Sequence, residues 1–214
     1  MSRLKGICGF KHFISFEGVE GCGKTTQARL LADYLKAKGH DDVLTTEEPG
    51  GTKIGLKIRD TLLAPGNHME PLTELLLYNS SRAQHIREVI YPALIKNTVV
   101  ITDRFIDSTV AYQGHGRGID LAIINTLNEI VASNLKPFVT FLLDIDVEEG
   151  LKRKRRVQKA DRLESENTEF HNRVRNGYLI IAEEEKNRVK VINASGSVEG
   201  IHKKIVEILE SVWL

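Results

Sequence analysis

The chain has 214 residues, of which 41% are hydrophobic and 28% are charged, and this composition excludes a disordered or collagen-like protein. Lysine and arginine number 30 and aspartate and glutamate 29, so the net charge of +1 does not suit a protein that binds nucleic acid over its whole surface. The two cysteines, Cys8 and Cys22, argue against a disulfide framework or a structural zinc site and suit a reducing compartment. We find no apolar stretch that predicts a signal peptide or a membrane span. We therefore expect one cytoplasmic domain over residues 1–214, with no membrane partner.

Short apolar runs alternate with amphipathic stretches along the chain. In chain order we expect a strand at 12–16, a helix at 27–39, a strand at 43–46, helices at 53–63 and 72–90, a strand at 98–102, a helix at 121–132, a strand at 138–143, helices at 147–157 and 168–186, a strand at 189–192 and a helix at 198–212. Five strands that alternate with helices predict an α/β fold with a parallel sheet covered on both faces. Such folds bind ligands at the carboxyl ends of the strands.

The turn after the first predicted strand, GVEGCGKT at residues 18–25, matches the phosphate-binding motif GxxxxGK[ST] in full. Its glycines let backbone N–H groups face a phosphate, and the following helix adds its positive end. We expect Lys24 to reach the β- and γ-phosphates and the Thr25 hydroxyl to bind Mg²⁺. The predicted ATP-binding residues are Gly18, Val19, Glu20, Gly21, Cys22, Gly23, Lys24, Thr25 and Thr26.

The sequence lacks the signature motifs of other classes of phosphate-loop protein. The guanine-reading motif NKxD of GTPases is missing, because residues 134–137 are Asn-Leu-Lys-Pro, and so is the LSGGQ signature of transporter ATPases. Two alternatives stay open at this point. One is a nucleotide-dependent switch or nucleic-acid-binding module that uses the basic run at 152–156, and the other is one of the small-molecule kinases.

Four segments, the first of which contains the phosphate-binding motif, bear on this choice: FEGVEGCGKTT at 16–26, EPGGT at 48–52, DRFIDSTVAYQG at 103–114, and the basic run that ends in DRLE at 161–164. In order and spacing they resemble bacterial thymidylate kinase, and the resemblance extends from about His12 to the C-terminus. It implies transfer of a phosphoryl group from ATP to dTMP with Mg²⁺, a five-stranded parallel sheet, a mobile lid and a homodimer. The neutral total charge leads us to expect no nucleic-acid partner. Another nucleoside monophosphate or deoxynucleoside kinase remains the alternative.

The resemblance also implies an acceptor site. Asp103 follows the third predicted strand, where it can hold a metal-bound water, and Arg59 and Arg104 would grip the monophosphate. Tyr78 stands where the family has a phenylalanine that stacks on thymine, and Arg82 lies four residues further on, as does the arginine that bonds the base. The predicted dTMP-binding residues are Glu20, Glu48, Arg59, Tyr78, Arg82, Arg104, Ser108, Tyr112 and Gln113, and the predicted metal residues are Thr25 and Asp103.

The basic run is expected to form a mobile lid at about residues 151–166. Because the phosphate loop has Gly21 after Glu20 and no arginine, the chain resembles the lid-arginine type of the family. We expect Arg153 to clamp the transferred phosphoryl group, with Arg155, Arg156 and Arg162 as alternatives, beside the catalytic residues Lys24 and Arg104. One position departs from the family: Glu47 replaces the usual arginine of TREPGGT, and we do not predict it as a site residue.

Overall fold

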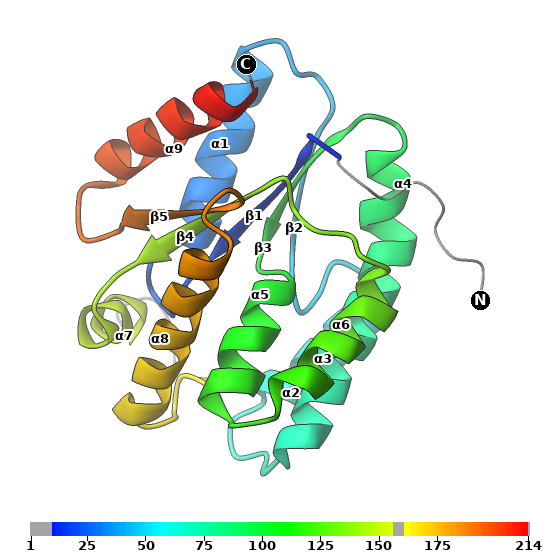
Figure 1. Ribbon diagram of the computed structural model, residues 1–214, viewed down its shortest axis with the longest axis vertical. Helices are drawn as coiled ribbons and strands as arrows, with labels where there is room; N and C mark the ends of the chain where they lie inside the picture. The colour runs from blue at the N-terminus through cyan, green and yellow to red at the C-terminus, as the bar shows by residue number, and fades with distance from the viewer. Residues whose placement is uncertain (1–9, 156–160, 214) are drawn as a thin grey trace.

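The computed structural model describes residues 10–155 and 161–213, and these contain a five-stranded parallel sheet between layers of helices (Figure 1). The strands are β1 (Phe13–Glu17), β2 (Val43–Glu47), β3 (Val99–Asp103), β4 (Val139–Asp144) and β5 (Val189–Asn193). Their order in the sheet is β2-β3-β1-β4-β5, and every neighbouring pair is parallel. The predicted fold class is confirmed.

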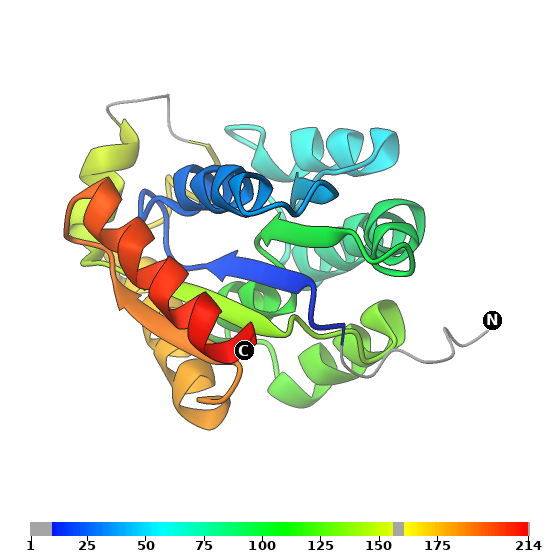
Figure 2. The same ribbon diagram turned by 90° about the horizontal axis from the view of Figure 1, so that it is seen from above.

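Helices cover both faces of this sheet. They are α1 (Lys24–Ala37), α2 (Lys53–Leu63), α3 (Pro71–His85), α4 (Tyr91–Leu94), α5 (Ile106–Thr109), α6 (Leu121–Ala132), α7 (Val147–Arg155), α8 (Thr168–Glu184) and α9 (Val198–Trp213), with π-helical turns η1 (Ile86–Ile90) and η2 (Val110–Gly116). Helices α1 and α9 pack together, and α1 and α6 lie on opposite sides of β1 (Figure 2). Among the described residues, none of these helices has the length and apolar character required to cross a bilayer.

The alternation of side chains along β1 explains how the sheet holds both layers. Ile14 and Phe16 join the core that includes α1 and α9, whereas Phe13 packs with Ile86 and Phe105 on the opposite face. Glu17 has the same parity as Phe13, so its carboxyl group enters the layer that contains α5 and α8. An ionisable group therefore lies in the core directly below the first turn of the phosphate loop, where its exposed fraction is 0%.

Two segments differ from their predictions. The expected helix at 72–90 is three consecutive segments, α3, η1 and α4, which end at Leu94. The π-helical turn η1 comes just before Pro92, which lacks the N–H that a regular helix needs. Residues 106–116 form α5 and η2, which we did not predict. Short helical turns of this kind, rich in glycine and β-branched residues, carry little periodicity.

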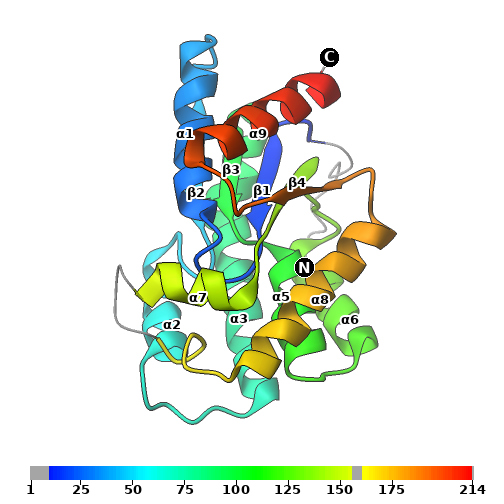
Figure 3. The same ribbon diagram turned by 90° about the vertical axis from the view of Figure 1, so that its left-hand side faces the viewer.

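The carboxyl ends of the strands define the functional edge of the molecule. The phosphate loop follows β1, the EPGGT loop follows β2, and Arg104 follows β3. Helices α2, α3 and α7 lie around the same edge (Figure 3). Residues that are more than 80 positions apart in the chain thus reach one place, as the rule for parallel sheets requires.

Candidate active site

A cleft of about 570 Å³ opens at the carboxyl edge of the sheet. The residues that line it include most of the predicted site: Glu20, Gly21, Gly23, Lys24, Thr25, Thr26, Glu48, Arg59, Tyr78, Asp103, Arg104, Ser108, Tyr112, Gln113 and Arg153. Of the described residues that we predicted, Gly18, Val19, Cys22, Arg82, Arg155 and Arg162 are not among those that line the cleft. Arg156 lies outside the described residues.

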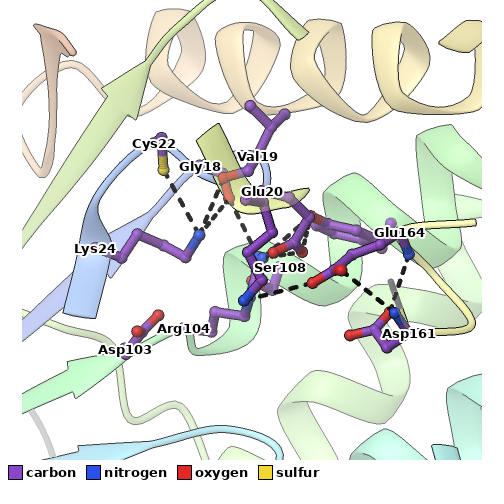
Figure 4. A network of polar contacts seen from close by, with 12 residues as sticks. Gly18, Val19, Glu20, Cys22, Lys24, Asp103, Arg104, Ser108, Asp161 and Glu164 are labelled. Atoms are coloured by element: carbon purple, nitrogen blue, oxygen red, sulfur yellow. Dashed lines mark hydrogen bonds and ion pairs between the residues drawn. The ribbon is translucent and has the colours of Figure 1, made fainter. Parts of the chain in front are cut away.

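The phosphate loop has the backbone that its glycines predict. Gly21 has a φ of 71°, and a Cβ atom built there would lie 1.9 Å from the carbonyl oxygen of Gly150 on α7, so no larger residue fits without displacing that helix. The Lys24 ammonium group donates to the carbonyl oxygens of Gly18 and Val19 at 3.2 and 3.0 Å (Figure 4). The Cys22 thiol is buried in the loop, and burial raises its pKa, so the sulfur serves as packing rather than as a thiolate nucleophile.

Two hard oxygen groups that could bind a metal ion lie side by side next to this loop. The Thr25 hydroxyl donates to the Asp103 carboxylate over 2.5 Å, which joins the start of α1 to the end of β3. A hydroxyl and one carboxylate suit Mg²⁺, which takes few protein ligands and keeps water and phosphate oxygens for the rest of its octahedron. The described residues contain no group of three or more His, Cys, Asp or Glu that could form an all-protein metal cage. The donor set therefore fits a magnesium ion that a nucleotide brings with it.

Arg104 is the centre of the polar network on the cleft floor. Its Nη2 atom donates to Glu20 at 2.5 Å and to the Tyr112 hydroxyl at 3.1 Å. Its Nη1 atom donates to the hydroxyls of Ser108 and Tyr178 at 3.2 and 3.1 Å. Burial opposes the ionisation of Glu20, but the charges of Arg104 and Lys24 prevail and lower the pKa of Glu20 to about 2. The site thus holds a fixed positive fork next to an ionised carboxylate.

The loop after β2 brings a second arginine to the cleft. Arg59, on α2, donates to the carbonyl oxygen of Pro49 at 2.7 Å and lies 3.3 Å from the carboxylate of Glu47. Glu47 itself lines the cleft, although sequence reasoning set it aside. The departure from the family pattern therefore places a negative charge directly against one of the two predicted phosphate-binding arginines.

The far side of the cleft is formed by α3. Tyr78 lines the cleft, and Gln113 lines it while donating to the buried carboxylate of Glu74 at 2.9 Å. Arg82 does not line the cleft: its guanidinium group is buried behind the wall and donates to Glu48 at 2.7 Å and to the Thr109 hydroxyl at 2.7 Å. Helical spacing predicted Tyr78 and Arg82 on one face of the helix. The ion pair with Glu48 holds the Arg82 side chain behind the cleft wall instead.

The neighbour of Arg82 in this wall is also held by charge. Burial opposes the ionisation of Glu48, but Arg82 and His85 hold the pKa of that carboxyl below its usual value. His85 is completely buried and lies 3.0 Å from Glu48 through Nδ1 and 2.7 Å from the Thr46 hydroxyl through Nε2. Glu48 is therefore a rigid, ionised part of the cleft wall.

The basic run contributes less of its charge to the cleft than we expected. Arg153 lines the cleft, but its guanidinium group donates to Glu149 at 2.5 Å and to the carbonyl oxygen of Ala194 at 2.9 Å. Arg155 is exposed. Arg162 makes a buried ion pair with Glu74 at 2.7 Å and donates to the carbonyl oxygen of Leu62, so it anchors the segment and does not face the cleft.

Three residues that we did not predict complete this side. Lys154, Asp161 and Glu164 line the cleft, and Lys154 lies 3.4 Å from Glu164. Asp161 and Glu164 accept from each other's backbone N–H groups at 2.9 and 3.3 Å (Figure 4), the reciprocal pattern of a capping box. Their spacing in DRLE is the signal that would have predicted this turn.

Comparisons with known proteins agree with this geometry. A sequence profile described as thymidylate kinase matches residues 16–205. The thymidylate kinase of Caldanaerobacter subterraneus is 49% identical over 198 residues, which cover 92% of this chain and 94% of the relative. That of a Sulfurihydrogenibium species is 50% identical over 199 residues, with 92% and 96% covered. The crystal structure of thymidylate kinase from Ehrlichia chaffeensis superposes with a TM-score of 0.76 at 37% identity and covers 92% of this chain and 97% of that one. With the profile spanning most of the chain and near-half identity to full-length relatives, the chain belongs to the thymidylate kinase family.

Proposed function

We propose that this enzyme transfers the γ-phosphoryl group of ATP to dTMP and releases dTDP and ADP. The observation that carries the proposal is that one cleft joins the phosphate loop to the two arginines and the tyrosine expected of an acceptor site. A phosphoryl donor bound at Lys24 and a phosphoryl acceptor bound at Arg104 would lie against the same wall of the cleft. This is because the phosphate loop follows β1 and Arg104 follows the neighbouring strand β3. Family membership supports the substrates, ATP with Mg²⁺ and dTMP.

At the donor end, the residues of the phosphate loop hold the triphosphate. The loop's N–H groups and the start of α1 surround the phosphates, and Lys24 moves its three donors from the carbonyl oxygens of its own loop to phosphate oxygens. The Thr25 hydroxyl would bind Mg²⁺, and the Asp103 carboxylate would hold the ion through a metal-bound water. When it is bound, the ion neutralises negative charge on the phosphate oxygens.

At the acceptor end, two guanidinium groups take the monophosphate. Arg104 already has a fixed orientation, and Arg59 exchanges its contact with Glu47 for the phosphate. The phenol ring of Tyr78 stacks on the base, and Gln113 bonds its edge, with Glu48 in the cleft wall and Arg82 buried behind it as support. Tyr112 and Glu20 face the sugar, where the phenol crowds the 2′ position and the carboxylate accepts from the 3′-hydroxyl.

Closure of the lid expected at about residues 151–166, of which 156–160 lie outside the described residues, completes the site. Arg153, with Arg155 and Arg156 as alternatives, leaves its present partners and clamps the transferred group from the side opposite Lys24. Glu149 and the carbonyl oxygen of Ala194 hold Arg153 before closure, and we expect the clamp to engage only with both substrates present. This order would limit the hydrolysis of ATP by water.

We also propose that the enzyme is a homodimer of the cytoplasm. Helices α2 and α3 pack side by side and carry exposed apolar side chains, Ile54, Leu56, Leu72 and Leu76, each 46–55% exposed. Light scattering should give twice the mass of the chain. Leu76→Asp should reduce that mass to the monomer value and Val191→Asp, at an exposed position on β5, should not; a monomeric wild type would refute the dimer.

The test of the activity is formation of nucleoside diphosphate from ATP and a panel of acceptors: dTMP, dUMP, ribothymidine monophosphate, dCMP, dAMP and dGMP. The proposal predicts the highest kcat/KM for dTMP and weaker turnover of dUMP, because one methyl group is worth only about 1–3 kcal/mol. Comparable kcat/KM values for dTMP and dAMP would point to another nucleoside monophosphate kinase. No turnover of any acceptor would refute the proposal.

A further inference from the structure

A buried carboxyl group lies beneath Arg104. Glu17, the last residue of β1, has an exposed fraction of 0%, and both of its oxygens are used. Oε1 accepts from the backbone N–H of Phe105 at 2.7 Å. Oε2 accepts from the hydroxyls of Ser108 at 2.6 Å and Tyr178 at 3.0 Å. Among the described residues, Glu17 makes no ion pair within 4 Å, so its charge acts on its surroundings through these three donors.

The first of these contacts fixes an unusual backbone. Arg104 has a φ of 75°, the left-handed region that a residue with a Cβ atom rarely adopts. Such a conformation persists only where its surroundings determine it. The N–H of Arg104 donates to the carbonyl oxygen of Phe16 and the Thr102 hydroxyl donates to the carbonyl oxygen of Arg104, both at 2.9 Å. Glu17 holds the next N–H, that of Phe105, and so fixes the far side of the turn.

The second oxygen fixes the guanidinium group. The hydroxyls of Ser108 and Tyr178 each have one hydrogen, and an ionised Glu17 can accept both. Their oxygens are then free to accept from Nη1 of Arg104 at 3.2 and 3.1 Å. A protonated Glu17 would instead donate its own hydrogen to one hydroxyl. That hydrogen occupies a lone pair and removes the negative charge behind both oxygens, so the attraction for Arg104 weakens.

We propose that Glu17 is a positioning residue for Arg104, and that its ionised carboxyl group sets the direction of the hydrogen bonds that aim the guanidinium group at the acceptor phosphate. The inference rests on the proposed function, in which Arg104 grips the phosphate of dTMP. Glu17 acts entirely through the turn and the two hydroxyls. Glu17 lies on β1 directly before Gly18, and Arg104 donates to the carbonyl oxygen of Gly18. Glu17 therefore also connects Arg104 to the start of the phosphate loop.

The surroundings of Glu17 move its pKa into the neutral range. Burial raises the pKa of Glu17 to about 7, and the negative charge of Asp107 on α5 adds to this, against the Ser108 hydrogen bond and the charge of Arg104. Asp107 is itself paired with Arg188, which approaches from the turn before β5, at 2.7 Å. From α8 the group that faces Glu17 is the neutral Tyr178, whose pKa burial raises well above its usual value. The phosphate loop contributes Glu20, on the far side of Arg104.

The test compares the wild type with Glu17→Gln, measuring KM for dTMP and kcat at saturating ATP and Mg²⁺ from pH 5.5 to pH 8.5. The amide resembles the protonated acid, since it can accept from Phe105 but must donate where the carboxylate accepted. The KM of Glu17→Gln for dTMP, divided by the KM of the wild type, should be within about twofold of one at pH 5.5. At pH 8.5 this ratio should rise to about ten, with a smaller change in kcat. Ionisation of the dTMP phosphate affects both proteins and cancels in the ratio. A ratio that does not change with pH would overturn the proposal.

A second variant decides the question if Glu17→Gln does not fold. Tyr178→Phe keeps the ring and removes one of the two hydroxyls, and it should raise KM for dTMP about threefold to tenfold at pH 8.5. The matched control is Tyr34→Phe on α1, whose hydroxyl contacts Glu210 away from the cleft and whose loss should leave KM unchanged. An unchanged KM in Tyr178→Phe overturns the proposal. A wild type without dTMP kinase activity would instead refute the proposed function, so the two failures are distinct.

Discussion

Burial of Glu17 predicts that the wild type loses stability as pH rises through the neutral range. In the unfolded chain this carboxyl titrates near its usual pKa of 4.5, whereas burial and Asp107 raise the folded-state pKa to about 7. Between these two values the folded protein holds a proton that the unfolded chain has already lost. The contribution of Glu17 to the free energy of unfolding therefore falls as pH rises from about 4.5 to about 7 and is constant above that range.

The size of the effect follows from the two pKa values. A difference between 4.5 and about 7 corresponds to a loss of about 3 kcal/mol, most of it between pH 5 and pH 8. Glu17→Gln removes this titration and keeps the volume of the side chain. Its free energy of unfolding, minus that of the wild type, should increase by about 2–3 kcal/mol between pH 5 and pH 8. The change with pH is diagnostic, because any fixed effect of the amide is the same at both values.

Urea unfolding at pH 5 and pH 8, followed by circular dichroism, measures this difference directly. The control is Glu210→Gln, an exposed residue of α9, for which the difference between variant and wild type should not change with pH by a comparable amount. Equal differences at the two pH values for Glu17→Gln, or a variant that loses stability relative to the wild type toward pH 8, would show that burial does not raise the pKa of Glu17. The expected result would show that the carboxylate beneath Arg104 is kept at a cost in stability.

Three further predictions concern the cleft. Lys24→Ala should lower kcat by at least about a hundredfold with an unchanged circular dichroism spectrum, because it removes the charge on the donor phosphates, and near-normal turnover would contradict this. Glu47→Gln should lower KM for dTMP severalfold, since Arg59 no longer exchanges one carboxylate for the phosphate; an unchanged or higher KM would show that Glu47 does not compete. Arg153→Ala should lower kcat more than it raises KM for dTMP, and a change in KM alone would exclude the clamp.

Most of the fold could be predicted because the strands carry strong local signals. The continuous apolar run at 138–143 predicted β4, and the helices at 53–63 and 121–132 have the bounds of α2 and α6. The irregular segments could not be predicted in the same way. The π-helical turn before Pro92 depends on how the surrounding helices pack, and α5 with η2 is too short to show periodicity.

Sequence motifs predicted part of the site, but residues that act through contacts with distant segments were missed. The phosphate loop follows from the spacing of its motif, whereas Arg104 and Tyr78 were expected from the resemblance to the family. Glu17 and Tyr178 are 161 residues apart and meet only because the Glu17 side chain leaves the sheet toward the helical layer that contains α8, so no pattern along the chain joins them. The burial of Arg82 likewise depends on Glu48, which comes from another loop. Polar residues that act through partners in distant segments are found by geometry alone.

A crystal structure with dTMP and a non-hydrolysable ATP analogue with Mg²⁺ would show directly whether the cleft holds both substrates as proposed. We expect the dTMP phosphate within hydrogen-bond distance of both Arg59 and Arg104, the base on the ring of Tyr78, and the γ-phosphate at Lys24. The acceptor oxygen should lie about 3–3.5 Å from the γ-phosphorus. A dTMP phosphate that contacts neither arginine, or a base bound elsewhere than on Tyr78, would contradict the account.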